Sequence, residues 1–376
     1  MFHVKQKTPD ALRFLDGAIQ QARDRDLLRR RPPPADGRAL SFCSNDYLDL
    51  ARELAPAEAC GAGASRLVYG DRPVHARLEE TAATLVGQAS ALAFTSGYAA
   101  NVGLLSALAG PGDLVVSDAL NHASIIDGAR LSRARVAVVP HLDLDAVDAA
   151  LRARREARAF VVTESYFSMD ADSPDLLALR QLCDARGAAL LVDEAHALGV
   201  LGPDGRGLCA EVGVCADAVV GTFGKAFGAG GAFVSGCPAL VTWLWNRARS
   251  FVFSTGLSPV VAAAALQGLR RAQAEPGRRL QVRRAAAMLR EGLGELGVRP
   301  RGTDHIVPWV LGTPARALRV AAALTERGLE VRAIRPPSVP DGTARIRLTV
   351  TAGHAAADVE RALTDFAAVV AMTGGE

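Results

Sequence analysis

The sequence lacks the features that would place it in a membrane or in an oxidising compartment. No apolar run reaches the length of a membrane span, and the first ten residues, MFHVKQKTPD, contain no apolar core of a signal peptide. The six cysteines form no CxxC pair and no cluster with histidine. A net charge of only +3 on 376 residues does not indicate a surface for nucleic acid or anionic lipid. We therefore expect a cytoplasmic protein with reduced cysteines, no metal site, and no nucleic-acid or membrane partner.

Internal repeats and low-complexity linkers are also missing, and the length suits one large domain plus a smaller one. Short apolar runs rich in Val, Leu and Ala occur at 91–95, 114–117, 136–139, 159–163, 188–192, 218–222 and 231–234. Continuous apolar runs separated by helix-length stretches are typical of parallel strands buried on both faces. We predict an α/β fold with a mostly parallel seven-stranded sheet flanked by helices. The last two runs are too close for a helical crossover, so this pair should be antiparallel.

The two ends of the chain have a different pattern. Residues 9–31 predict a helix, because Thr8 can cap it and its apolar residues recur at helical spacing, and three prolines at 32–34 should end it. From about residue 271 a charged helical stretch precedes the strand-like runs HIVPWVL, LEVRAI and ARIRLTV. We therefore predict an N-terminal helical segment (1–45), a large α/β domain (46–270) and a small C-terminal α+β domain (271–376).

Reactive side chains follow five of the seven predicted strands. In open α/β sheets, ligands bind beyond the carboxyl ends of the strands. The residues found there are Ser96, Gly97 and Tyr98; Asp118, Asn121 and His122; Glu164 and Ser168; Asp193, Glu194 and His196; Thr222 and Lys225. Each one alone has an ordinary structural explanation, such as a helix cap. Their concentration at one edge indicates an active site.

Lys225 stands out because it lies among glycines, in GTFGKAFG, between two predicted buried strands. A phosphate-binding P-loop is excluded, because the glycine spacing differs and Ala226 replaces the residue that would bind magnesium. A lysine buried beside a cofactor has its charged form disfavoured and becomes an amine nucleophile. Such an amine can form a Schiff base with an aldehyde cofactor.

Pyridoxal 5'-phosphate (PLP) is the aldehyde cofactor that the neighbouring residues suit. It needs a carboxylate at its ring nitrogen, which Asp193 can supply, and a flat group against its ring, which His122 can supply. It also needs helix-start amides and a hydroxyl at its phosphate, and these are available at Gly97, Tyr98 and Thr222.

Eight blocks of the sequence resemble one family, the α-oxoamine synthases among the fold type I PLP enzymes. The resemblance covers about residues 10–372. It is carried by SFCSNDYLDL, TSGYAAN, NHASIIDGARLS, TESYFSMDAD, VDEAHALGVLGPDGRG, TFGKAFGAGGAFVSG, FSTGLSP and AIRPPSVPDGTARIRLTVTAGH.

The resemblance implies a role for each site residue. Lys225 would form the Schiff base, Asp193 would pair with the ring nitrogen and His122 would stack on the ring. The other matching positions are Gly97, Tyr98 and Thr222 at the phosphate, His196 and Ser168 around the phenolic oxygen, Arg347 at the amino-acid carboxylate, Asn45 and Ser338 beside the substrate, and Arg29 at the acyl substrate.

The implied reaction is a PLP-dependent decarboxylative transfer of an acyl group to an amino acid. The last block is most similar to the family member of biotin biosynthesis, which joins L-alanine to a pimeloyl thioester of coenzyme A or acyl carrier protein. A member that joins glycine or serine to another acyl thioester remains an alternative. So does a non-catalytic partner subunit, although Lys225, Asp193 and His122 together argue against it. Family members are homodimers with the site at the subunit interface, so we expect a homodimer.

Three positions depart from the family pattern. Residues 51–62 are shorter than usual, Tyr69 replaces a small residue, and Ala171 replaces a usual glycine. The first two lie near the expected path of the acyl chain, so they bear on which acyl donor is used.

Overall fold

The large sheet has seven strands and is mostly parallel. The structure is a computed structural model that describes residues 14–29 and 39–373. In spatial order the strands are β2 (Ser90–Phe94), β8 (Ala232–Gly236), β7 (Ala218–Thr222), β6 (Ala189–Asp193), β5 (Arg158–Glu164), β3 (Asp113–Asp118) and β4 (Arg135–Val139). Only β8 runs antiparallel to its neighbours β2 and β7. The predicted sheet and its antiparallel last pair are therefore confirmed.

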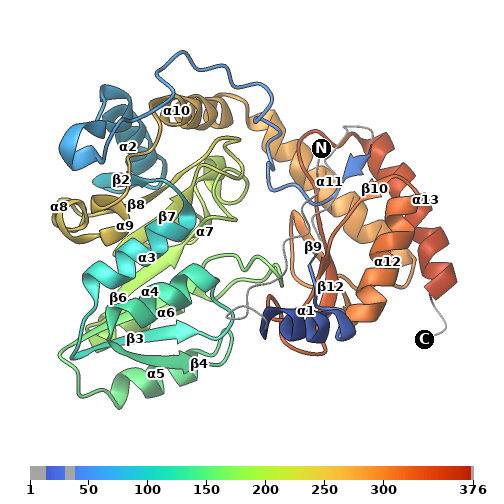
Figure 1. The fold of residues 1–376 in the computed structure, drawn as a ribbon, viewed down its shortest axis with the longest axis horizontal. Coiled ribbons are helices and arrows are strands. Elements are labelled where there is room, and N and C mark those ends of the chain that lie inside the picture. Colours follow the sequence, from blue (N-terminus) through green and yellow to red (C-terminus); the bar gives the residue numbers. More distant parts are fainter. Residues whose placement is uncertain (1–13, 30–38, 374–376) are drawn as a thin grey trace.

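Helices cover both faces of this sheet, as the continuous apolar runs predicted (Figure 1). They are α2 (Pro73–Leu85), α3 (Gly97–Leu108), α4 (Ala123–Ser132), α5 (Leu144–Arg152), α6 (Leu176–Arg186), α7 (Leu208–Glu211), α8 (Pro238–Arg247) and α9 (Arg249–Val252), with short turns η2 (Arg66–Gly70) and η3 (Pro203–Gly205). Successive residues of β3 belong to two different hydrophobic clusters. Val115 packs with residues of α3, α4 and α8, whereas Leu114 and Val116 pack with residues of α5 and α6. Burial on both faces explains why polar residues are absent from the middle of these strands.

The loop between β7 and β8, residues 223–231, carries Lys225 and needs its glycines for close packing. Gly228 has φ +65°, and a Cβ there would lie 2.6 Å from the backbone nitrogen of Ala51. Gly231 has φ +88°, and a Cβ there would lie 2.9 Å from the carbonyl oxygen of Phe94. A side chain at either position would displace backbone, so the lysine loop is fixed by packing on both sides.

A second body of structure follows the large sheet and lies beside it (Figure 1). Helices α10 (Pro259–Ala274) and α11 (Pro276–Glu295) lead into an antiparallel sheet of β11 (Ala333–Ile334), β12 (Ala344–Thr349) and β9 (Ile306–Gly312), accompanied by α12 (Pro314–Glu326) and α13 (Ala356–Thr373). The strand predicted over LEVRAI is instead two short strands in different sheets. Its first part, β10 (Leu329–Glu330), pairs in parallel with β1 (Leu40–Ser41). The predicted domain boundary after residue 270 falls within α10 and stays a prediction.

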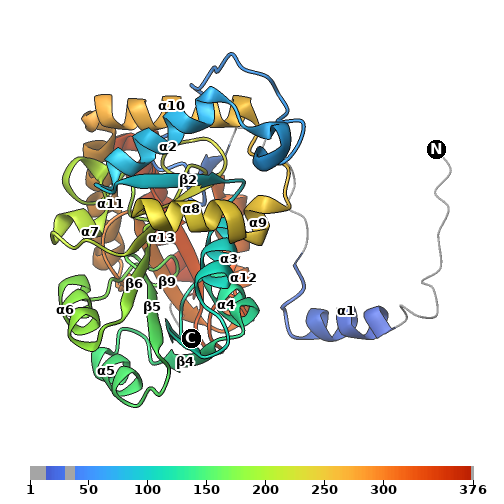
Figure 2. The ribbon, with the colours of Figure 1, turned by 90° about the vertical axis from the view of Figure 1, so that its left-hand side faces the viewer.

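The N-terminal helix is shorter than predicted. Helix α1 (Phe14–Asp24) projects from the body of the chain (Figure 2). The prediction of helix is wrong for residues 25–29, because Asp26 has a left-handed backbone (φ 55°) and its carbonyl accepts a hydrogen bond from Arg335. Residues 9–13, the arginines at 30 and 31, and the prolines at 32–34 lie outside the described residues. Within the described ranges, no helix combines the length and apolarity that crossing a membrane requires.

Candidate active site

Lys225 is held at the centre of a polar cluster beyond the end of β7. Its Nζ lies 2.7 Å from His196 Nε2. Burial lowers the pKa of Lys225 from 10.5 to about 8, although the negative charges of Asp193 and Glu164 raise it. An amine with this pKa is partly neutral near physiological pH and can therefore act as a nucleophile or base.

Asp193 ends β6 and lies opposite Glu164 of β5 in the parallel register. Its buried carboxylate accepts hydrogen bonds from Asn101 Nδ2 at 2.7 Å and from the backbone amide of Ala195 at 2.9 Å. Burial, followed by repulsion from Asp193, raises the pKa of Glu164 to about 8. Both hydrogen-bond donors to Asp193 are neutral groups, so the carboxylate can still pair with a cationic group.

His122 is the N-cap residue just before α4, and two small polar side chains connect it to Asp193. Its Nδ1 lies 2.7 Å from Ser124 Oγ, which accepts a 3.0 Å hydrogen bond from Asn101. Burial lowers the pKa of His122, Asp193 raises it, and Lys225 lowers it. The histidine ring is therefore oriented and uncharged, as a group that stacks on a cofactor ring should be.

Arg347 is a buried cation whose hydrogen-bond partners in the described residues include no carboxylate. From β12 it donates to Asn45 Oδ1 at 3.0 Å, to the Tyr47 hydroxyl at 3.3 Å and to the backbone carbonyl of Ser168. Arg345, two residues earlier, is also buried but donates at 2.8 Å to the carboxylate of Asp170. A buried charge without a counter-ion is costly. Arg347 is therefore the better candidate for binding a substrate carboxylate.

The start of α3 offers an anion site. Ser96 caps the helix by accepting from Ala99 N at 3.1 Å, and the first amides of a helix have no partners within it. A Cβ built at Gly97 would meet no atom within 4 Å, so space lies next to these amides. Tyr98 donates its hydroxyl proton to Asp127. The Thr222 hydroxyl donates to the Gly231 carbonyl at 3.0 Å and accepts from the Gly224 amide at 3.2 Å, so it can donate to a phosphate only after its proton turns away from Gly231.

A cleft of about 680 Å³ opens beside His122 and Ser168, between the end of the large sheet and the loop after β11. Its lining includes Leu27, His122 and Ser338. Arg29, predicted at the acyl substrate, and Ser338, predicted beside the substrate, are joined here by a 2.9 Å hydrogen bond across 309 residues of sequence.

The structure also locates the three departures from the family pattern. Residues 51–62 form turns and irregular backbone without a helix. Tyr69 lies at the surface with two-thirds of its side chain exposed, and the guanidinium of Arg72 stacks on its ring. It does not belong to the lining of the cleft within this chain. Ala171 has φ 58°, a left-handed backbone, which explains why glycine suits its position.

Sequence reasoning missed four residues that complete the site: Tyr47, Asn101, Ser124 and His305. The first three lie inside the sequence blocks that carry the family resemblance, so the blocks were a usable indication. His305 was read only as the start of a strand. It is fully buried, and neither ring nitrogen has a hydrogen-bond partner among the described residues.

Comparison with known proteins gives a consistent relationship. Residues 38–366 match the family model described as aminotransferase class I and II. A relative from Anaeromyxobacter dehalogenans (strain 2CP-1), named 8-amino-7-oxononanoate synthase, is 48% identical over 94% of this chain and 95% of its own length. A protein of the same name from Mycolicibacterium smegmatis is 47% identical over 89% and 90% of the two chains. Serine palmitoyltransferase from S. paucimobilis, solved with bound PLP–myriocin aldimine, superposes with a TM-score of 0.87 and 28% identity, covering 98% of this chain and all of that one.

The chain therefore belongs to the class I and II aminotransferase family, and its fold is the fold type I PLP transferase fold predicted from the sequence. Within that family, the relatives that share nearly half of its residues are 8-amino-7-oxononanoate synthases. The resemblance read from the motifs is confirmed.

Proposed function

We propose that the chain is a PLP-dependent acyltransferase that joins L-alanine to a pimeloyl thioester, releasing 8-amino-7-oxononanoate, CO2 and the free thiol carrier in biotin biosynthesis. The observation that carries the proposal is the pairing of two cationic side chains with different roles. Lys225 has a lowered pKa, and Arg347 has no carboxylate partner among its described hydrogen-bond partners. Together they suit an amino-acid substrate, which needs an amine to take its Cα proton and a cation to bind its carboxylate.

The residues present fit PLP as the resident cofactor. Asp193 would hold the ring nitrogen, His122 the ring face, the start of α3 and Thr222 the phosphate, and Lys225 the aldehyde carbon. The open space beside Gly97 and the neutral donors to Asp193 suit an anionic phosphate and a cationic ring nitrogen. When bound, PLP supplies an aldehyde that captures an amine and a ring that withdraws electrons from Cα.

The chain's own groups then bind the amino acid and move its proton. Arg347, held by the backbone carbonyl of Ser168, would form a two-pronged contact with the carboxylate of alanine. The neutral amine of Lys225 receives the Cα proton at Nζ, since its pKa near 8 makes it a suitable base. Asp193, buried and held by Asn101 and the Ala195 amide, would stabilise positive charge at the cofactor ring.

The acyl chain would occupy the cleft. Its apolar lining includes Leu27, Ile126 and Phe167, which suit a methylene chain. The Arg29–Ser338 pair offers a cation and a hydroxyl for a polar end group, as a pimeloyl chain requires.

We also propose a homodimer. Large apolar side chains are exposed on η2 and just after α9, including Val68, Tyr69 and Phe253. These two elements are adjacent, because the guanidinium of Arg66 in η2 lies over the ring of Phe251 in α9. Exposed apolar area of this kind marks an association surface. Light scattering after size exclusion should give twice the chain mass.

The deciding experiment pairs alanine, glycine and serine with acetyl, succinyl, palmitoyl and pimeloyl thioesters, on coenzyme A and on acyl carrier protein. We expect alanine with pimeloyl thioester to give the highest kcat/KM, and the gene to complement a biotin auxotroph that lacks this step. Preference for glycine or serine with a different acyl group, together with failed complementation, would reassign the chain to another α-oxoamine synthase. A protein without turnover on any pair would contradict the enzyme assignment.

A further inference from the structure

A continuous series of hydrogen bonds connects Lys225 to Arg347 through the interior. We call it the relay, and its members are Lys225, His196, Tyr47, Asn45 and Arg347. His196 Nε2 lies 2.7 Å from Lys225 Nζ, and His196 Nδ1 lies 2.8 Å from the Tyr47 hydroxyl. The same hydroxyl lies 3.1 Å from Asn45 Oδ1, and Arg347 donates to both. The relay therefore joins the proposed reactive amine to the proposed carboxylate site.

Tyr47 is the branch point of the relay. Its hydroxyl carries one proton but lies within hydrogen-bond distance of two acceptors, His196 Nδ1 and Asn45 Oδ1. Burial raises the pKa of Tyr47, so the hydroxyl stays protonated over the working pH range. The direction in which that one proton points determines which nitrogen of a neutral His196 carries hydrogen.

Two arrangements of protons satisfy the relay. In the proton-poor arrangement, Tyr47 donates to His196 Nδ1, and His196 donates from Nε2 to a neutral Lys225 amine. In the proton-rich arrangement, a Lys225 ammonium donates to His196 Nε2, His196 donates from Nδ1 to the Tyr47 oxygen, and Tyr47 donates to Asn45. The two differ by one proton on Lys225, and neither breaks a hydrogen bond between Lys225, His196 and Tyr47.

We propose that Tyr47 is a positioning residue whose hydroxyl turns between His196 and Asn45, so that His196 changes tautomer each time Lys225 gains or loses a proton. The proposal rests on the proposed function only for the identity of Lys225 as the reactive amine. The relay itself is a property of the folded chain.

The proposal requires a His196 that never carries two ring protons. Burial lowers its pKa well below 6.5, and the positive charges of Lys225 and Arg347 lower it further. His122 and His305 also lie near it, and their lowered pKa values leave both rings uncharged. The acidic groups that face Lys225, Asp193 and Glu164, raise the lysine's pKa rather than that of His196. The histidine therefore remains neutral while the lysine titrates.

His305 keeps the Tyr47 ring in place. The two rings meet edge to face, with centroids 4.2 Å apart. Burial, followed by the charges of Arg347 and Arg290, lowers the pKa of His305 to about 3, so it adds no charge to the relay. Contact with a buried neutral ring fixes the tyrosine while leaving its hydroxyl proton free to turn about the C–O bond.

Substrate binding shifts the relay in a definite direction. A carboxylate bound to Arg347 takes the guanidinium donors that Asn45 Oδ1 and the Tyr47 oxygen accept in this structure. Both oxygens are then freer to accept from Tyr47 and His196 respectively, which is the proton-rich arrangement. Amino-acid binding thereby prepares the site to hold the proton that Lys225 removes from Cα.

The test uses the full-length protein freed of cofactor, with 15N-labelled histidine and 13C-labelled lysine. The His196 resonances are assigned by their loss in His196→Gln. Between pH 6 and 10 we expect His196 to change from the Nδ1–H to the Nε2–H tautomer, with the same midpoint as the Lys225 titration. In Tyr47→Phe the coupled change should disappear. The Lys225 pKa should fall by about one unit, a tenfold loss of proton affinity, because Nδ1–H would be a buried donor without a partner.

Tyr166→Phe is the matched control. Tyr166 is also buried, and its ring lies tilted beside that of His305 with centroids 5.2 Å apart, but its hydroxyl donates to the Thr303 carbonyl outside the relay. Tyr166→Phe should therefore leave the titrations of His196 and Lys225 unchanged.

In the loaded enzyme, Tyr47→Phe should move the acidic limb of the kcat profile down by about one pH unit. A wild-type His196 that keeps one tautomer across the lysine titration would overturn the proposal, and so would equal effects of the two phenylalanine variants. Neither outcome bears on the substrate assignment, since the cofactor-free measurement needs no turnover.

Discussion

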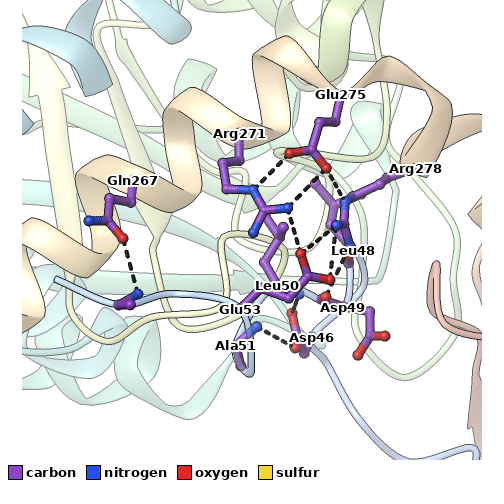
Figure 3. A network of polar contacts seen from close by, with 11 residues as sticks. Asp46, Leu48, Asp49, Leu50, Ala51, Glu53, Gln267, Arg271, Glu275 and Arg278 are labelled. Carbon is purple, nitrogen blue, oxygen red and sulfur yellow. Dashed lines mark hydrogen bonds and ion pairs between the residues drawn. The ribbon is translucent and has the colours of Figure 1, made fainter.

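One short segment, residues 45–53, is held by two polar networks of opposite character. On its inner side, Asn45 and Tyr47 belong to the buried relay. On its outer side, Glu53 belongs to an exposed group of ion pairs, which we call the clamp and which consists of Glu53, Arg271, Glu275 and Arg278 (Figure 3).

The clamp joins the segment to the junction of α10 and α11. Arg278 donates to Glu53 at 2.8 Å and to the backbone carbonyls of Leu48 at 2.9 Å and Asp49 at 3.1 Å (Figure 3). Hydrogen bonds from Arg271 and Arg278 lower the pKa of Glu275 to about 2. Every charge in the clamp has an opposite charge beside it, and solvent reaches all of them.

The comparison shows how burial decides the use of a polar network. The relay contains two cations and no carboxylate, and the low polarity around it favours a neutral lysine. The clamp contains two cations and two anions in water, where such pairs contribute little individually and are screened by salt. The relay controls protonation states, and the clamp holds a chain segment in place.

The most damaging change should be Lys225→Ala. It removes the amine of the relay, so turnover and any borohydride-reducible linkage to the cofactor should both be lost. The variant should still fold, because deleting a buried amine relieves its desolvation. Mass spectrometry after borohydride treatment checks the linkage, and circular dichroism checks the fold. A wild-type level of reducible linkage would assign the amine to another residue.

Asp193→Asn should slow turnover by more than the roughly 10²-fold that loss of one good electrostatic contact costs. The amide fits the same space but cannot hold a cationic ring nitrogen. Its kcat with alanine, compared with that of Asn101→Ala, separates the charge of the carboxylate from its orientation. Activity close to that of the wild type would remove Asp193 from the cofactor site.

His141→Gln tests a polar network that is partly buried, between the buried relay and the exposed clamp. Burial lowers the pKa of His141, but hydrogen bonds to Asp118 at 2.8 Å and Asp172 at 3.2 Å raise it to about 10. The folded pKa exceeds the unfolded value of 6.5, so the stabilisation is complete below pH 6.5 and is lost as pH rises through 10. We expect a loss on the order of 1–3 kcal/mol at pH 6 that shrinks toward pH 10.

Urea unfolding of the wild type and His141→Gln at several pH values measures this difference. Adding Asp172→Asn to the variant should cost little more, because the shared interaction is already gone. A difference in stability that grows with pH would contradict the assigned sign.

The smallest effect is expected in the clamp. Arg278→Ala should lower the free energy of unfolding by about 1 kcal/mol, chiefly through lost hydrogen bonds to the Leu48 and Asp49 carbonyls. Glu53→Gln should lower Tm less, and its effect should vanish in concentrated salt. Arg270→Ala, at an exposed neighbouring position, is the control. If Arg278→Ala lowered the free energy of unfolding as much as a large-to-small substitution in the core does, the clamp would contribute more than exposed ion pairs can.

The sequence predicted the large sheet well because its strands are continuous apolar runs. It predicted Lys225 because the glycines that mark this lysine are its neighbours in the sequence. It predicted Asn45 and Arg347 only through family motifs, since nothing local to either residue indicates a contact across 302 positions. The relay was missed because Tyr47 reads as an ordinary core aromatic until its partners are known. Helix α1 was extended too far because Leu27 continues the helical spacing, although it lines the cleft.

The pairing of β1 with β10 has a consequence for how the protein is made. Residues 40–41 leave the ribosome early, but their partners at 329–330 follow almost three hundred residues later. At roughly 5–20 residues per second, the wait lasts on the order of 15–60 s. During that interval the strands of the large sheet and the lysine loop are already synthesised, while Tyr47 still lacks Arg347. The proposed carboxylate site is therefore the last part of the proposed active site to be assembled, and a chain released early would carry the amine without it.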